Sequence, residues 1–232
     1  MIDALLEEGL LKLGLEAADP FCSLLIRYVE EIELFNPAYG LVKVLDRREL
    51  IVKHILDSLA PVPIIRGLMQ TSLHGKTVFR IADVGSGAGL PGIPLAVYIN
   101  NAEFTLIERM GRRAGFLRNV IALLDLPNTR VEETEMEKIS LHTPGCFDLI
   151  VFRAFRPLDA QILKGLLRLL AGGGTLAAYK GRRQTIEEEM TAAFSTTKKG
   201  KAPSIGAWEI IPLKVPFLEE ERHLLLIGTS GI

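Results

Sequence analysis

Two acids and a cluster of glycines are the residues of this sequence whose types and spacing could do chemistry. Asp83 lies near the end of the apolar run Val78–Val84, which leads into glycines at alternate positions over residues 85–89. Glycines let a backbone approach a ligand closely, and the free N–H groups at the start of the following helix are expected to point toward that ligand. Glu108 follows a second apolar run, Glu103–Ile107, where a carboxylate can accept hydrogen bonds from both hydroxyls of a ribose. This order of residues predicts a nucleotide site.

The charge of the ligand separates two interpretations of this loop. The segment Gly87–Gly92 matches G-x-G-x-x-G, so a nicotinamide-dependent oxidoreductase is one alternative. In such enzymes the first glycine of the motif stands at the strand end, whereas this strand ends at Gly85. The carboxylate of Asp83 would repel a pyrophosphate but favour S-adenosylmethionine, which carries a sulfonium and an ammonium group. We therefore predict that Asp83, Gly85, Gly87 and Glu108 belong to a site for S-adenosylmethionine.

The composition indicates a folded protein of the cell interior. The chain has 232 residues, of which 48% are hydrophobic and 24% are charged, and its formal net charge is −1. Cys22 and Cys146 lie far apart without clustered histidines, so we expect core thiols, no metal site and a reducing, cytoplasmic compartment. The first residues lack a basic segment followed by an apolar one, so neither a signal peptide nor a membrane span is expected.

The first 70 residues have helical periodicity. Apolar side chains form one stripe along Phe21–Phe35, which the segment Asn36–Gly40 is expected to end. Asp46 and Glu49 have the spacing of a capping box for a helix that runs to Pro61. His54 lies near the apolar face of that helix, and we interpret it as a hydrogen-bonded core residue rather than a catalyst.

From Lys76 onward strands alternate with helices. Strands are predicted at Val78–Val84, Glu103–Ile107, near Arg130–Glu132, at Phe147–Phe152 and at Thr175–Tyr179, and helices at Arg113–Leu124, Leu158–Leu170 and Gln184–Phe194. The helix before the fifth strand is expected to end at glycines 172–174. This alternation predicts an α/β fold with a mostly parallel sheet, and the closing strands Trp208–Val215 and Arg222–Gly228 should form an antiparallel hairpin.

Six segments together resemble the bacterial ribosomal RNA small subunit methyltransferase G family, also called glucose-inhibited division protein B. They are His54–Ser58, Asp83–Leu95, Phe116–Arg118, Arg153–Phe155, Lys180–Gly181 and Glu221–Leu224. The resemblance implies a Rossmann-like, S-adenosylmethionine-dependent methyltransferase fold with seven strands. The change of periodicity divides the chain into a helical extension at residues 1–70 and a methyltransferase domain at residues 71–232. The resemblance to the family runs from about Leu24 to the C-terminus. It also implies methylation of guanine N7 in 16S rRNA, with that RNA or the small ribosomal subunit as partner.

The resemblance also assigns roles to particular positions. It implies cofactor contacts by Gly85, Leu90, Met136, Glu137 and Arg153. Guanine N7 has an available lone pair, so we expect no general base, and Arg153 would position the reactants. An ion pair of Arg153 with Asp148 or Asp159 is the alternative. The chain departs from the family pattern at Gly40-Leu41-Val42 and at Glu135, where the family usually has Asn-Leu-Thr or Asn-Leu-Ser and an arginine.

Clustered cations predict where RNA would bind. They follow the second, fourth and fifth strands, whose ends lie on one edge of a parallel sheet: Arg109, Arg112, Arg113 and Arg118; Arg153 and Arg156; Lys180, Arg182 and Arg183. Tyr39 and Phe155 could stack on an extruded base. The alternatives are an ordinary solvated surface, a methyltransferase of this fold acting on a small molecule, and an RNA-binding scaffold without activity. We expect a monomer.

Overall fold

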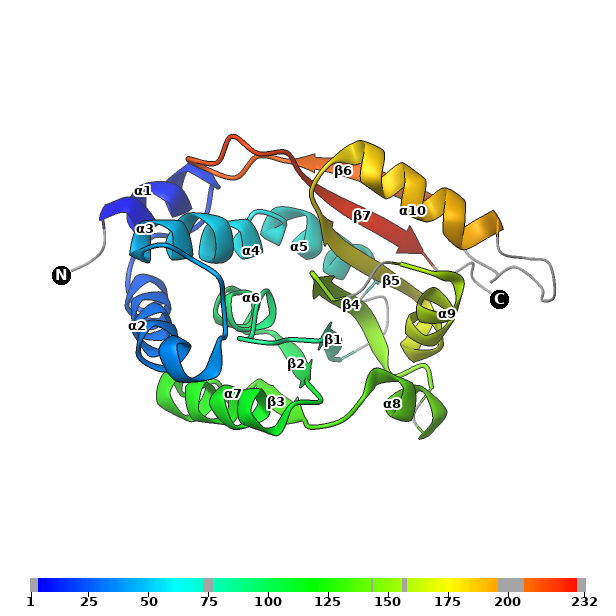
Figure 1. Cartoon of the computed structure of the whole chain (residues 1–232), viewed down its shortest axis with the longest axis horizontal. Helices are drawn as coiled ribbons and strands as arrows, with labels where there is room; N and C mark the ends of the chain where they lie inside the picture. The colour runs from blue at the N-terminus through cyan, green and yellow to red at the C-terminus, as the bar shows by residue number, and fades with distance from the viewer. Residues whose placement is uncertain (1–3, 73–76, 143, 156–157, 196–206, 229–232) are drawn as a thin grey trace.

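A seven-stranded sheet in the order β3-β2-β1-β4-β5-β7-β6 runs through the molecule (Figure 1). The computed structural model describes residues 4–72, 77–142, 144–155, 158–195 and 207–228. The strands are β1 (Phe79–Val84), β2 (Ala102–Ile107), β3 (Thr129–Glu132), β4 (Phe147–Arg153), β5 (Leu170–Lys180), β6 (Trp208–Leu213) and β7 (Arg222–Gly228). Strands β1 to β5 pair in parallel, and β7 pairs antiparallel with both β5 and β6. The predicted α/β fold with its antiparallel C-terminal hairpin is confirmed.

Helices cover both faces of this sheet. The helices that follow β1 are α6 (Gly92–Tyr98), α7 (Gly111–Leu124), α8 (Met136–His142), α9 (Ala160–Leu169) and α10 (Arg183–Ser195). Successive strand residues alternate between faces, so Ile81 packs in one apolar cluster with α6 and α7, while Ala82 packs in a second cluster with α9 and α10. Both faces of the sheet are therefore buried, as a parallel sheet requires.

The N-terminal helices join the first of these clusters. They are α1 (Ala4–Lys12), α2 (Phe21–Tyr39), α3 (Arg47–Leu50), the π-helix η1 (Ile51–Leu56), α4 (Asp57–Leu59) and α5 (Val62–Ser72). The buried Tyr28 of α2 donates a hydrogen bond to the carbonyl of Ala88 in the glycine loop at 2.7 Å. Tyr179 at the end of β5 donates to the carbonyl of Ser58 at 2.9 Å. The boundary near residue 70 stays a prediction, but the helices before it share a core with the sheet.

Of two predicted helix ends, one is confirmed and one is wrong. Helix α2 ends within the expected segment Asn36–Gly40: it continues through Pro37 to Tyr39, where Gly40 takes a left-handed conformation with φ 58° and ends it. Helix α9 ends at Leu169, and glycines 172–174 lie inside β5 instead of capping the helix. A Cβ at Gly174 would lie 3.1 Å from the carbonyl oxygen of Asp148, so the missing side chain lets β5 approach β4 where their register shifts.

The start of α3 matches its predicted cap in part. The side chain of Asp46 accepts a hydrogen bond from the Glu49 N–H at 2.8 Å, and the Glu49 carboxylate accepts one from Leu45 N–H, not from Asp46. The helix then widens into η1, a π-helical segment that the periodicity did not predict. Such segments are rare and often occur at functional sites. Here η1 carries Lys53 and His54.

Candidate functional site

A small cavity lies at the carboxyl ends of β1, β2 and β4. It has a volume of about 190 Å³ and is lined by Val84, Gly85, Ile107, Glu108, Arg109, Met110, Arg113, Thr134, Glu135, Met136, Ala154 and Phe155. Of the residues predicted to contact the methyl donor, Gly85, Glu108 and Met136 meet here. The other predicted residues, Asp83, Gly87, Leu90, Glu137 and Arg153, do not line this cavity, and the side chain of Leu90 is buried in the core. Glu135, where the family usually has an arginine, also faces this cavity.

Glu108 holds the glycine loop in place. Its two carboxylate oxygens accept hydrogen bonds from the N–H groups of Gly87 at 2.9 Å and Met110 at 2.8 Å, and the side chain is buried. Each carboxylate oxygen has a second acceptor position, so these bonds leave room for two hydroxyl donors. The side chain therefore fits the predicted contact with a ribose.

The sequence predicted free backbone N–H groups at this loop, but in the structure these groups donate hydrogen bonds within the protein. Gly87 donates to Glu108, Gly92 donates to Asp83 at 2.9 Å, and Ile93 donates to the carbonyl of Gly89 at 2.7 Å. The reason is that the two acids fold back onto the loop and take up the donors that a pyrophosphate would need. This arrangement disfavours dinucleotide binding and the oxidoreductase alternative.

Asp83 is fully buried beneath the loop. Its Oδ2 accepts from Gly92, whereas its Oδ1 has no hydrogen-bond partner within the described residues. Burial raises the pKa of Asp83 to about 7, an effect that the Gly92 hydrogen bond and the nearby charge of Arg153 oppose. A buried carboxylate with an unused oxygen is suited to a cationic ligand, because a positive charge would stabilise its ionised form. The residues present fit S-adenosylmethionine.

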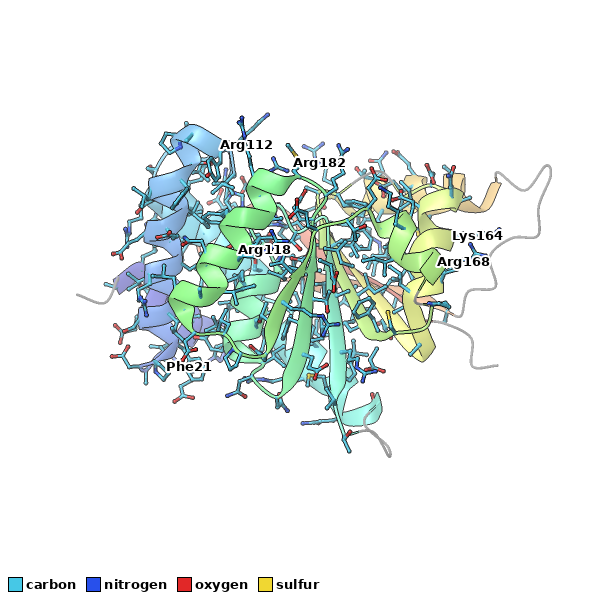
Figure 2. The ribbon with its side chains drawn as sticks, turned by 90° about the horizontal axis from the view of Figure 1, so that it is seen from below. Phe21, Arg112, Arg118, Lys164, Arg168 and Arg182 are labelled. Carbon is cyan, nitrogen blue, oxygen red and sulfur yellow. The ribbon has the colours of Figure 1, made fainter. Side chains whose placement is uncertain are left out.

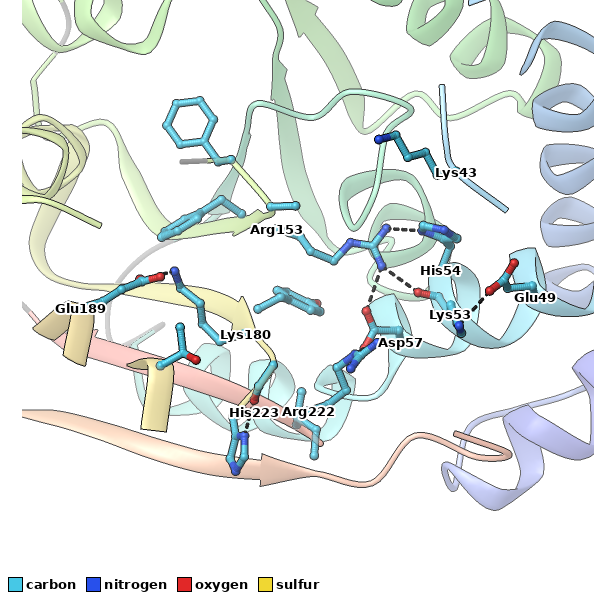
Figure 3. Close-up of a pocket in the computed structure, with 17 residues that line it drawn as sticks. Lys43, Glu49, Lys53, His54, Asp57, Arg153, Lys180, Glu189, Arg222 and His223 are labelled. Atoms are coloured by element: carbon cyan, nitrogen blue, oxygen red, sulfur yellow. Dashed lines mark hydrogen bonds and ion pairs between the residues drawn. The ribbon is translucent and has the colours of Figure 1, made fainter. Parts of the chain in front are cut away.

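A second, larger cavity adjoins the first and contains most of the charge. It has a volume of about 700 Å³ and lies between η1, α4, the ends of β4 and β5, and the start of β7 (Figure 3). Its charged and titratable lining residues are Lys43, Glu49, Lys53, His54, Asp57, Arg153, Lys180, Glu189, Arg222 and His223. Ala154 and Phe155 line both cavities, so the two are neighbours at the end of β4.

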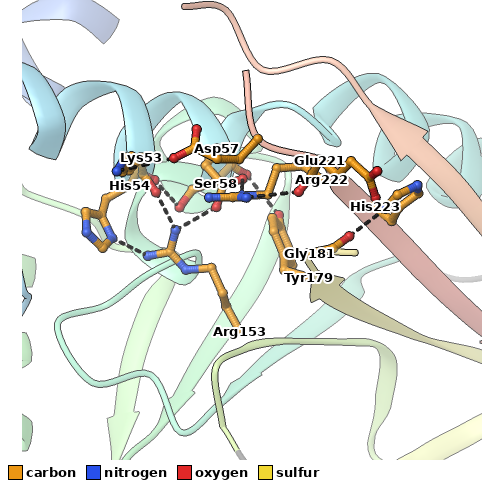
Figure 4. Close-up of polar contacts among 11 residues, drawn as sticks. Lys53, His54, Asp57, Ser58, Arg153, Tyr179, Gly181, Glu221, Arg222 and His223 are labelled. Carbon is orange, nitrogen blue, oxygen red and sulfur yellow. Dashed lines mark hydrogen bonds and ion pairs between the residues drawn. The ribbon is translucent and has the colours of Figure 1, made fainter. Parts of the chain in front are cut away.

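Arg153 lines the larger cavity and is fixed by the helical extension (Figure 4). Its Nη1 donates to Asp57 Oδ2 at 2.8 Å and to the carbonyl of Lys53 at 3.1 Å, and its Nη2 lies 2.9 Å from His54 Nδ1. The Asp57 carboxylate also pairs with Arg222, whose Nε lies 3.2 Å from Oδ1.

The two acids suggested as alternative partners of Arg153 serve other groups. Asp148 accepts from the Arg80 N–H at the opposite end of β4, and Asp159 caps α9. The suggestion of those two partners was wrong because it considered only acids near Arg153 in sequence, whereas the ion pair joins residues 96 positions apart.

His54 is a hydrogen-bonded residue, as predicted, but it belongs to a cavity wall. Burial and the adjacent Arg153 guanidinium lower the pKa of His54 to about 4, so the ring is neutral near pH 7. A guanidinium can only donate, so the Nδ1 of His54 accepts and the ring proton resides on Nε2. His54 thus orients Arg153 without adding a charge.

Phe155 lines both cavities. Its ring packs against Gly85 so closely that a Cβ at Gly85 would lie 2.3 Å from Cδ2 of Phe155. Gly85 has φ 71°, a conformation that also favours glycine. The phenyl ring makes a T-shaped contact with Phe152 of β4. Tyr39, the other aromatic residue proposed to stack on a base, is exposed and packs against Phe35 at the end of α2.

The predicted RNA-binding cations occupy different surroundings. Arg109, Arg112 and Arg182 are exposed, and Figure 2 places Arg112 and Arg182 at one end of the molecule. Arg118 lies farther along α7 and pairs with Glu133 at 2.8 Å. Arg113 lines the small cavity, where its buried Nε has no hydrogen-bond partner within the described part of the chain.

The remaining predicted cations lie near β5 or outside the described residues. Lys180 lines the large cavity and pairs with Glu189 at 2.5 Å, and Arg183 pairs with Glu187 on α10 at 2.9 Å. Arg156 lies outside the described residues. The cations that lead into the cavities are therefore only part of the predicted set.

Sequence reasoning missed several residues of the large cavity, namely Lys43, Lys53, Asp57 and Arg222. A signal for Arg222 was present. Because β7 runs antiparallel to β5, its first residue lies at the same edge as the last residues of the parallel strands. We had considered only the ends of parallel strands.

Over the residues that the structure describes, no group of three or more His, Cys, Asp or Glu side chains could hold a metal ion. In the same residues, no helix has the length and apolar character needed to cross a membrane. Cys22 is buried and Cys146 partly buried, and both are free thiols.

The fold is that of S-adenosylmethionine-dependent methyltransferases. The chain is similar to an S-adenosylmethionine-dependent O-methyltransferase from Thermotoga maritima, with a TM-score of 0.53, 14% identity, and coverage of 88% of this chain and 72% of the other. It is also similar to an S-adenosylmethionine-dependent methyltransferase from Aquifex aeolicus, with a TM-score of 0.52, 15% identity, and coverage of 74% and 91%. These likenesses concern the fold alone and define its class.

Sequence comparison identifies the family within that class. The model of the rRNA small subunit methyltransferase G family matches residues 21–210. A relative from Treponema pallidum, named ribosomal RNA small subunit methyltransferase G, is 42% identical over 97% of this chain and 94% of its own length. A relative of the same name from Xanthomonas euvesicatoria is 38% identical with the same coverage. The chain belongs to the rRNA small subunit methyltransferase G family.

Proposed function

We propose that this protein transfers a methyl group from S-adenosylmethionine to N7 of a guanine in 16S rRNA of the small ribosomal subunit. The observation that carries the proposal is the pair of adjoining cavities at the carboxyl edge of the sheet, one lined by Glu108, with Asp83 buried beneath the adjoining glycine loop, and the other rich in cations. The first suits a cationic nucleotide donor, and the second suits a polyanionic acceptor. Membership of the family, whose relatives are named for the small-subunit RNA, supports the same acceptor.

Asp83 and Glu108 would each contribute to binding of the donor. S-adenosylmethionine, when bound, supplies a methyl group on a positively charged sulfur. Asp83, with its free Oδ1, would stabilise that positive charge from beneath the loop, and Glu108 would accept from the ribose hydroxyls. Met136 lines the far side of the cavity and would pack against the adenine.

The reaction requires little acid–base catalysis by the protein. The N7 lone pair forms the new bond to carbon as the carbon–sulfur bond breaks, so the positive charge passes from sulfur to the guanine ring. No proton is removed from N7, and no general base is needed. The residues instead align the reactants, and we assign that role to Arg153, which three groups of the helical extension hold in place.

Transfer of a tritiated methyl group tests the proposal. Small subunits from a strain lacking this protein should accept label, and mapping should place it on N7 of a guanine in 16S rRNA. Label on another atom, on a protein, or on none of the RNA would contradict the proposal. A methyltransferase acting on a small molecule would bind the donor equally well, but its affinity for subunits would be absent or independent of salt, whereas contacts to phosphates weaken steeply as salt rises.

A further inference from the structure

The large cavity carries more positive than negative charge. Its lining includes five lysine and arginine side chains and three carboxylates. Each carboxylate has a cationic partner in the cavity wall: Glu49 with Lys53 at 2.7 Å, Asp57 with Arg153 at 2.8 Å, and Glu189 with Lys180 at 2.5 Å. Arg222 and Lys43 are the two cations left over. A cavity with this balance favours an anionic occupant.

Arg222 shares a carboxylate with Arg153. Asp57 is buried, with a side chain only 4% exposed, and lies between the two guanidinium groups. One carboxylate neutralises one of the two charges, so the wall keeps a positive charge that is shielded from water. The bonds from Arg153 to Lys53 and His54 fix the plane of its guanidinium. A fixed, planar guanidinium suits a phosphate, whose oxygens it can bind in pairs.

Lys43 contributes the second unneutralised charge. It has no hydrogen bond or ion pair with the part of the chain that the structure describes, and its exposed side chain reaches toward the cavity from the loop after α2 (Figure 3). The loop itself is anchored, because Asn36 of α2 accepts a hydrogen bond from the Val42 N–H at 2.9 Å. Lys43 is therefore a free ammonium group on a supported loop, close to Arg153.

We propose that Lys43 and Arg153, with Arg222 behind them, form a phosphate subsite for the RNA nucleotide whose base is methylated, and that Asp57 is the positioning residue for both arginines. The inference rests on the proposed function and specifies how its acceptor is held. The cavity adjoins the donor cavity through Ala154 and Phe155, so a base attached to that phosphate lies next to the methyl group. At about 700 Å³ the cavity has room for a whole nucleotide.

Binding of guanosine 5′-monophosphate and of guanosine, measured by calorimetry, tests the subsite without turnover. The wild-type protein should bind the monophosphate at least about tenfold more tightly, since a charge-assisted phosphate contact is lost in guanosine. In Lys43→Ala this ratio should fall toward one. Lys164→Ala is the matched control, because Lys164 is an exposed lysine on α9, away from both cavities (Figure 2), and its ratio should equal that of the wild type.

Methyl transfer to small subunits from a strain lacking the protein provides the second readout. In Lys43→Ala the KM should rise, and the salt dependence of log KM should decrease by about 0.7 to 0.9, the slope of one phosphate contact. Asp57→Asn should raise KM more than it lowers kcat, and Asp57→Glu should restore part of the loss, because a carboxylate would again hold both arginines. An unchanged KM in Lys43→Ala would overturn the subsite.

The binding measurements distinguish a phosphate subsite from the alternative explanations of this cavity. If the wild-type protein binds guanosine as tightly as its monophosphate, the cavity has no phosphate subsite. If Lys43→Ala weakens S-adenosylmethionine as much as it weakens the monophosphate, the cations serve the carboxylate of the donor, which also overturns the proposal. If wild-type protein distinguishes the two ligands but methylates no subunits, the subsite stands and the proposed acceptor is wrong.

Discussion

The two cavities at the carboxyl edge of the sheet are built in opposite ways. The small cavity takes Gly85 and Glu108 from the ends of the neighbouring strands β1 and β2, and Asp83 and Glu108 hold the glycine loop beside it through the N–H groups of Gly92 and Gly87. The large cavity is assembled from Lys43, Arg153 and Arg222, which lie more than sixty positions apart. The first is a local structure, whereas the second exists only when the whole chain has folded.

The electrostatics of the two regions differ in the same way. Beneath the glycine loop beside the small cavity, the buried Asp83 has an unpaired oxygen, so its charge is uncompensated until a cation binds nearby. In the large cavity a buried acid is shared by two guanidinium groups, so the excess charge is positive. The two cavities share the wall formed by Ala154 and Phe155. The comparison suggests that each cavity can be disabled without the other.

The largest expected effect is the loss of the acid under the loop. Asp83→Asn keeps an oxygen to accept from Gly92 but removes the charge. A unit charge about 5 Å away at an effective dielectric constant of about 20 contributes roughly 3 kcal/mol, so S-adenosylmethionine should bind about 100-fold more weakly. Calorimetry measures this. Binding of guanosine 5′-monophosphate should be unchanged, and an equal loss for both ligands would mean that the cavities are not independent.

The next effect concerns the stability of the large cavity. Asp57→Asn leaves two partly buried guanidinium groups without a counter-charge, which should lower the free energy of unfolding by about 3 kcal/mol. For a chain of this length that corresponds to a decrease in Tm of roughly 6 to 12 °C. Glu133→Gln is the control, since it breaks the exposed pair with Arg118 and should cost about 1 kcal/mol or less. Equal decreases in Tm for Asp57→Asn and Glu133→Gln would contradict the distinction between the shared carboxylate of the cavity wall and an exposed ion pair.

How much of each cavity could be predicted follows from this difference in construction. The strand, glycine loop, helix and second strand are adjacent in sequence, and local patterns predicted Gly85 and Glu108 correctly as neighbours in one cavity. What patterns did not predict is where the loop N–H groups point. That depends on Asp83 folding back to Gly92, a contact of side-chain geometry rather than of periodicity.

The large cavity was harder to predict for a topological reason. Arg153 was correctly placed at the end of β4, but its partner Asp57 lies in the helical extension, and no local pattern relates the two. The π-helical turn of η1 also shifts the helical phase before Asp57, so a regular 3.6-residue projection misplaces its side chain. The set of cations predicted from the sequence included Arg118, which pairs with Glu133 and does not line the cavity. It omitted Lys43, which lines the cavity and has no partner among the described residues.

A substitution at the boundary should have an intermediate effect. Gly85→Ala places a Cβ 2.3 Å from Phe155 Cδ2 and imposes φ 71° on alanine, so it should destabilise the protein by roughly 2 kcal/mol. The double variant Gly85→Ala/Phe155→Ala removes the collision but keeps the backbone strain. We expect the double variant to lose less unfolding free energy than the sum of the losses in the two single variants, as measured by urea unfolding. Strict additivity would mean that the ring and the loop do not touch in solution.

The smallest expected effect is a pH dependence confined to the small cavity. The pKa of Asp83 is raised to about 7, so in the donor-free protein this acid is mostly protonated at pH 6 and mostly ionised at pH 8. A cation prefers the ionised form, and affinity for S-adenosylmethionine should therefore rise by about tenfold over this range. Calorimetry at several pH values should show the rise in wild type and none in Asp83→Asn.

Stability should change in the opposite direction. Because the folded pKa of Asp83 is raised above its ordinary value of 3.8, the folded state binds this proton more tightly than the unfolded state. The resulting stabilisation is complete below pH 4 and is lost as pH rises through about 7. His54, whose pKa is lowered to about 4, acts in the other direction and loses its contribution as pH falls below 6.5. Urea unfolding between pH 6 and 8 should thus show wild type losing stability relative to Asp83→Asn, while its affinity for the donor increases. If stability and donor affinity changed in the same direction, Asp83 would not be the group that titrates.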